Sequence, residues 1–225
     1  MHFLDIVPTF VGLTFLATTL LTIWLFFRAT NYSKLSLRII ISWAILHSIF
    51  AIIGLYLDVS VVPPRILLSL LPIFIFIGRL FNTQKGKVFI DSLSLEKLTL
   101  LHIVRVPVEI VLYWLFLYTA IPELMTFEGR NFDILAGITA PIVYYFVFIK
   151  KSMSKKMLLG WNIVCLLLLI NIVVNAILSS PVPFQKFAFE QPNIAILYFP
   201  FNLLPSVVVP LVLFSHLVAI RRLLK

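Results

Sequence analysis

The sequence has a single cysteine, Cys165, which lies within an apolar run. An intrachain disulfide is therefore impossible, and a thiol in such surroundings is usually a packing residue. Charged residues are scarce as well, because they make up 12% of the 225 residues whereas hydrophobic residues make up 61%. No polar segment is long enough to fold separately. The composition excludes a conventional soluble domain and predicts one membrane-embedded domain over residues 1–225.

Common catalytic and metal-binding motifs are missing too. The sequence has no His-Glu-x-x-His, no Gly-x-Ser-x-Gly and no phosphate-binding loop, and its four histidines are scattered. We therefore predict no metal site, and no cofactor is indicated. A retinal pigment is excluded because the last apolar run has no lysine before Lys225. His216, near the inner end of that run, is predicted to lie at the membrane interface.

Acidic residues are half as frequent as basic ones, nine against eighteen, so the formal net charge is +9. On a soluble module this excess would suggest nucleic acid. Here the basic residues lie between apolar runs, so we expect no nucleic-acid partner. The expected partner is the lipid bilayer.

Long apolar runs dominate the chain. A run of about 20 residues crosses a hydrocarbon core about 30 Å thick when it is helical. The runs are continuous rather than alternating, which favours helices over barrel strands. The sequence predicts an all-α bundle of seven transmembrane helices, at approximately 6–27, 37–57, 64–82, 98–122, 133–149, 157–178 and 195–220.

The charges between these runs predict the orientation of the bundle, because cytoplasmic loops collect Lys and Arg. Alternate connections and the carboxyl-terminal tail carry net charges of +3, +2, +4 and +3, and the opposite side, which includes Asp5, carries −3. We therefore expect the amino terminus outside and the carboxyl terminus in the cytoplasm, in a plasma or inner membrane.

Arg105 and Glu109 are ionisable residues inside the fourth run, on either side of Pro107. Such residues are costly in hydrocarbon and usually face a bundle interior or a wet cavity. With His102 and Tyr113 they fall within an arc of about 80° on a helical wheel, and Glu109 lies near the middle of the bilayer. Since the order cation-then-acid is the less favourable one at this spacing, we expect partners on other helices.

Other spans offer polar side chains at similar depth. Amide and hydroxyl groups in membrane helices often bond neighbouring helices, and the alternative is that they line a shared pocket. We predict a ligand-binding set around the ionic pair, made up of Glu109, Arg105, His102, Tyr113, His47, Asn171 and Asn202.

The charged outer connection 123–133 precedes the fifth run. We interpret it as a capping segment, in which Asn131 or Asp133 satisfies the first amides of the following helix. The alternative is a mouth that gathers a cation or docks a partner.

Three functions are compatible with this pattern. The first is binding or transport of a small molecule or lipid through a mid-membrane site around Arg105 and Glu109. The second is an intramembrane enzyme that acts on a lipid, with Glu109 or His47 as acid or base. The third is a receptor-like or structural seven-helix subunit, in which the two charges would be buried and dry.

Overall fold

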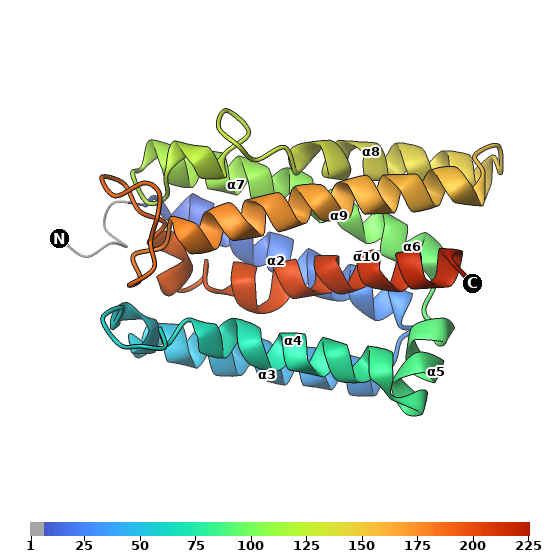
Figure 1. Ribbon diagram of the computed structural model, residues 1–225, viewed down its shortest axis with the longest axis horizontal. Coiled ribbons are helices and arrows are strands. Elements are labelled where there is room, and N and C mark those ends of the chain that lie inside the picture. The colour runs from blue at the N-terminus through green and yellow to red at the C-terminus, as the bar shows by residue number, and fades with distance from the viewer. Residues whose placement is uncertain (1–6) are drawn as a thin grey trace.

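The structure is a computed structural model that describes residues 7–225, and over this part it contains helices and turns but no strand. Apart from α5, which stands across the end of the bundle, the helices lie along one axis, with the carboxyl terminus at one end (Figure 1). The prediction of an all-α fold is confirmed for these residues. In chain order the described helices are α2 Thr9–Ala29, α3 Lys34–Ile52, α4 Leu67–Asn82, α5 Gln84–Ser92, α6 Leu95–Leu101, α7 Arg105–Leu117, α8 Ile134–Tyr144, α9 Lys155–Leu178 and α10 Val209–Leu223.

Short irregular turns extend three of these helices. A 3-10 turn at His102–Val104 joins α6 to α7, and π-helical turns at Tyr145–Ile149 and Leu204–Val208 follow α8 and precede α10. Each lies within a few residues of an intrahelical proline, Pro107, Pro141 or Pro205. Proline supplies no N–H to the carbonyl four residues earlier, and such local adjustments absorb the missing bond.

Within residues 7–225, five helical stretches are long and apolar enough to cross a membrane. A sixth arises if α4 and α5, which meet at 92°, form one broken span, and Ile134–Ile149 is a shorter apolar helix. Several apolar helices thus indicate a membrane location. The long stretches are Thr9–Ala29, Lys34–Ile52, Leu95–Leu117, Lys155–Leu178 and Leu204–Leu223.

Several segments differ from the sequence-based boundaries, and one boundary is not described. Helix α3 ends at Ile52 rather than at 57, and α7 ends at Leu117 rather than at 122. The last helix begins at Leu204 rather than at 195, because the preceding residues form a 3-10 turn at Ala195–Leu197 and further turns. Helix α5 was not foreseen. A Cβ at Gly86 would lie 2.2 Å from the Leu80 carbonyl oxygen, so only glycine fits the sharp corner between α4 and α5. Residue 6, the start of the first expected span, and Asp5 lie outside the described residues.

The main hydrophobic core is formed by α2, α6, α7 and α10, with α9 packed against α10. Helices α3 and α4 both lie on one side of the bundle (Figure 1), and each contacts the Leu204–Val208 turn before α10. Two hydrogen bonds connect α3 to the segment before α10. The indole Nε1 of Trp43 donates to the Ser206 carbonyl at 2.9 Å, and the Asn202 amide donates to the His47 carbonyl at 2.8 Å.

The carboxyl-terminal end of α10 is tied to α5. Arg221 and Lys225 each contact a carboxylate oxygen of Asp91 at 2.6 Å. These hydrogen bonds, from Lys225 first and then Arg221, hold the pKa of the Asp91 carboxyl below its usual value. Arg222 also donates to the Leu93 carbonyl.

The connection between α7 and α8 turns back along the bundle, and α8 starts near the middle of the bundle's length (Figure 1). Its backbone is bonded internally, since the amides of Arg130 and Asn131 donate to the carbonyls of Leu124 and Thr126 at 3.2 and 3.1 Å. Non-helical backbone at membrane depth requires such internal satisfaction. This connection carries polar side chains into the interior.

Candidate functional site

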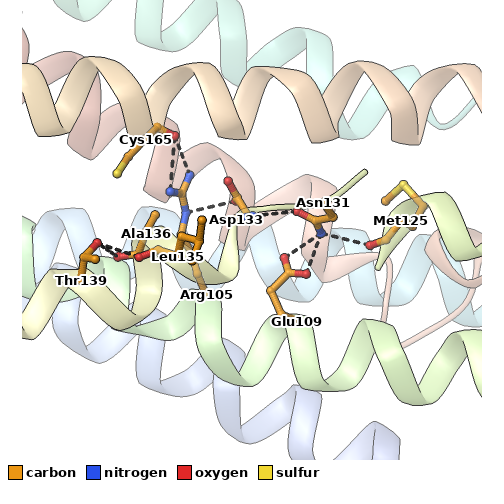
Figure 2. Close-up of polar contacts among 9 residues, drawn as sticks. All are labelled: Arg105, Glu109, Met125, Asn131, Asp133, Leu135, Ala136, Thr139 and Cys165. Carbon is orange, nitrogen blue, oxygen red and sulfur yellow. Dashed lines mark hydrogen bonds and ion pairs between the residues drawn. The ribbon is translucent and has the colours of Figure 1, made fainter. Parts of the chain in front are cut away.

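Arg105, in the first turn of α7, joins three elements of the bundle. The side chain is 3% exposed, and its Nε lies 3.2 Å from Oδ2 of Asp133 at the start of α8. Its Nη1 and Nη2 donate to the Cys165 carbonyl of α9 at 3.4 and 3.3 Å (Figure 2). The guanidinium is therefore committed to partners within the protein.

Glu109 lies one turn further along α7 and bonds to the same connection. The side-chain amide of Asn131 approaches the two carboxylate oxygens at 2.8 and 2.7 Å and the Met125 carbonyl at 3.0 Å (Figure 2). Both Glu109 and Asn131 are buried. An amide nitrogen has two hydrogens for these three acceptors, so Glu109 keeps unused acceptor capacity.

The expectation that Arg105 and Glu109 find partners outside their own helix is confirmed by these contacts. The close approach of α8 to α7 makes them possible. A Cβ at Gly137 would lie 2.8 Å from the Val106 backbone nitrogen and 3.2 Å from the Arg105 Cβ. The absence of a side chain at Gly137 therefore sets the position of the α8 start, and with it Asp133, relative to Arg105.

A cavity of about 100 Å³ adjoins this network. The polar residues along it are Glu109, Asn131, Asp133, Ser180 and Asn193, whereas Arg105 does not line it. Its walls are almost wholly apolar and come from the beginnings of α4 and α10 and from α7 and α9, including Leu70, Leu112, Ile172 and Leu204. Two acidic residues but no basic residue therefore border the cavity.

The network contains two acidic groups, Glu109 and Asp133, and one basic group, Arg105, which pairs with Asp133. If both carboxylates are ionised, the cluster carries a net charge of −1. Burying an uncompensated charge costs several kcal/mol even after relaxation. A bound proton or a bound cation would neutralise it.

His102 lies one turn from Arg105 but belongs to a separate cluster. Its ring stacks on that of His216 with centroids 3.8 Å apart, and His216 Nδ1 lies 2.9 Å from the Asn162 side-chain oxygen. His216 is fully buried within the bundle, and its depth near the membrane interface stays a prediction. The π-helical start of α10 and the pairing of α10 with α9 turn this histidine inward. No group of three or more metal-ligating side chains occurs in the part of the chain that the structure describes.

The remaining predicted residues lie away from Glu109. Tyr113 is half-buried and stacks on Phe127, with ring centroids 4.9 Å apart. Asn171 donates to the Arg130 carbonyl at 2.8 Å, so it supports the α7–α8 connection without lining the cavity. His47 and Asn202 come together on the far side of α10, where His47 bonds the Tyr56 hydroxyl.

Two residues of the network were assigned another role from the sequence. The prediction that Asn131 or Asp133 caps the start of the fifth run is confirmed for Asn131, whereas Asp133 makes no side-chain bond to the first amides of α8. Asn131 accepts from the Asp133 amide at 3.1 Å but directs its own amide to Glu109. One feature of the sequence could have indicated that Asp133 pairs with Arg105. The connection next to the span of Arg105 contains several carboxylates, and Arg105 had no partner within its own helix.

The fold and this network define an all-helical protein with several candidate membrane spans and a buried ionic cluster. Within that class, the chain belongs to the family described as Domain of unknown function (DUF8737), which matches residues 61–224, about three quarters of its length. Neither the curated proteins nor the solved structures contain a significant match to the chain.

Proposed function

We propose that this protein binds or transports a small molecule at the Glu109 cavity, and that the group it holds there is cationic or donates hydrogen bonds. The lining carries the proposal: Glu109 and Asp133 are among the residues that border the cavity, and Arg105 is not. A ligand with a positive group would offset the excess negative charge of the cluster. An anionic headgroup would add to that excess, so the arginine is not the recognition element.

The size of the cavity limits the group that enters it. A volume of about 100 Å³ is enough for ordered water and a small polar group. An ammonium group or a proton with its water fits this space, whereas a whole lipid does not. The mainly apolar walls suit a ligand whose remaining part is hydrocarbon.

The intramembrane enzyme has less support. It requires Glu109 and His47 at one substrate atom, but His47 bonds the Tyr56 hydroxyl and does not line the cavity.

Alkylammonium ions test the proposed site. Methylammonium and tetramethylammonium are expected to raise the melting temperature of the purified protein in detergent, whereas acetate is not. At 100 times its dissociation constant, a ligand stabilises by about 2.7 kcal/mol. Glu109→Gln, which keeps the shape and removes the charge, is expected to abolish this shift.

The control is Glu128→Gln, an exposed carboxylate of the same connection, which should respond as the wild type does. Equal stabilisation of the Glu109→Gln protein by the amines would remove the centre of the proposal. If a well-folded Glu109→Gln protein no longer responds to the amines, the alternative of a purely structural subunit loses its support.

We also propose that the chain crosses a plasma or inner membrane seven times, with its amino end outside and its carboxyl end in the cytoplasm. The alternating charge of the connections supports this orientation. The basic connections before α3 and α9 lie near the same end of the bundle as the carboxyl terminus (Figure 1). Crossings by α4 and by α8 would complete the count of seven.

Single-cysteine labelling tests the orientation, because Cys165 is buried and can be replaced first by serine. In the Cys165→Ser background, a membrane-impermeant maleimide added to intact cells is expected to label Glu128→Cys but not Lys156→Cys. Both positions are exposed. The reverse pattern would invert the orientation, and labelling of both on one side would exclude an odd number of crossings between them.

A further inference from the structure

A second, larger void lies among α3, α4 and α10. This cleft has a volume of about 850 Å³, within the range of ligand-binding pockets. Its walls are faces of α3 and α4 on one side and of α10, with Phe26 of α2, on the other. It shares no lining residue with the Glu109 cavity. The cleft is therefore a distinct candidate site.

The attachment of α3 and α4 explains why the cleft is open. Midway along its length, α3 is held by the bond from Trp43 to the Ser206 carbonyl. Towards the α5 end, Phe81 and Phe89 pack on Phe214 of α10, with ring centroids 6.1 and 6.5 Å apart. Between these contacts, side chains of α3, α4 and α10 line the cleft.

The lining is apolar along most of its length and polar near the start of α3. The apolar part includes Ile39, Ile73 and Phe76, while Arg38, Ser36 and Ser42 supply polar groups. Arg38 is exposed, and none of the ion pairs found among residues 7–225 involves it. An unpaired cation thus stands at one end of an apolar cleft.

The position of Arg38 suits a lipid headgroup. It lies four residues after the start of α3, or about 6 Å along the helix axis. Arginine binds phosphate through paired, charge-assisted hydrogen bonds. The connection before α3 carries Arg28 and Lys34 as well, and such basic segments attract anionic lipids of the cytoplasmic leaflet.

We propose that the cleft binds one phospholipid with an anionic headgroup. The phosphate contacts Arg38 with the Ser42 hydroxyl one turn further along α3. An acyl chain lies between Ile73 and Phe76 of α4 and Leu211 and Phe214 of α10. The lipid fills the gap and joins α3 and α4 to the bundle.

Native mass spectrometry of the delipidated full-length protein tests the headgroup. Phosphatidylglycerol is expected to bind at least tenfold more tightly than phosphatidylcholine with the same chains. Arg38→Gln should remove this preference. Arg79→Gln is the matched control, because Arg79 is an exposed arginine of α4 that does not line the cleft. Equal binding of the two lipids, or an unchanged preference in the Arg38→Gln protein, would overturn the proposal.

A cleft-filling substitution tests the position of the acyl chain. Ile73→Trp should reduce phosphatidylglycerol binding at least tenfold, whereas Ile75→Trp, on the exposed face of the same helix, should not. Ile39→Trp is a second variant for the case that Ile73→Trp does not elute as a single species. Wild-type binding by a folded cleft variant would place the lipid elsewhere. A lipid-free dimer that excludes added phosphatidylglycerol would instead assign the cleft to a second copy of the chain.

Discussion

Replacing Arg105 with glutamine is expected to lower the free energy of unfolding by about 3–5 kcal/mol, the usual cost of removing one partner of a buried ion pair. The substitution leaves Asp133 and Glu109 without a cation and frees the Cys165 carbonyl. Unfolding of the detergent-solubilised protein in a denaturant titration measures the change. A loss of this size is a large part of the stability of a typical domain.

The exposed pair Arg65–Asp58 provides the control for this prediction. Its atoms lie 3.0 Å apart, and each side chain is 39% exposed. Arg65→Gln should therefore cost no more than about 1 kcal/mol. The double variant Arg105→Gln with Asp133→Asn should be more stable than the sum of the single changes predicts, because it removes both charges. Additive effects, or equal losses at Arg65 and Arg105, would show that the buried pair is not coupled in this way.

Gly137→Ala is expected to destabilise the protein by about 1–3 kcal/mol, the typical cost of inserting a group into a well-packed interior. The new Cβ would lie 2.8 Å from the Val106 backbone nitrogen, and backbone atoms cannot move aside as a flexible side chain can. Helix α8 would have to shift away from α7 and take Asp133 with it. The melting temperature in detergent reports the change.

Gly160→Ala is the matched control, since Gly160 lies inside α9 and nothing surrounds its Cβ position within 4 Å. Alanine is favoured over glycine in a helix by about 1 kcal/mol, so this variant should be as stable as the wild type or more stable. If the two alanine variants shifted the melting temperature in the same direction, the packing argument for Gly137 would fail.

The helices could be predicted because their signal is local. Continuous apolar runs such as the one that became α9 exclude other structures by length and composition alone. That Arg105 and Glu109 have partners outside their own helix could also be predicted from local sequence, because the order of the two residues disfavours a bridge within the helix. Such arguments need no knowledge of which helices are neighbours.

The partners of Arg105 and Glu109 could not be predicted without knowing which helices are neighbours. His47 and Asn202 have suitable depths for a site at Glu109, but depth does not tell on which side of α10 a residue lies. His102 and His216 stack although 114 positions separate them, and a helical wheel cannot supply that pairing. The role of Asp133 could not be predicted because capping is the common role of an acidic residue before a helix. The α7–α8 connection is also irregular, so no hydrophobic periodicity in the sequence indicates that it returns into the bundle.

The α7–α8 connection has a practical consequence for engineering the protein. Surface connections usually accept tags and inserted residues, but this one passes Asn131 and Asp133 to the interior, and a Cβ at Gly129 would lie 2.4 Å from the Glu123 carbonyl oxygen. Its length is therefore as constrained as that of a core helix. An epitope or a fluorescent reporter is better placed between Lys150 and Ser154, where the chain turns at the surface before α9.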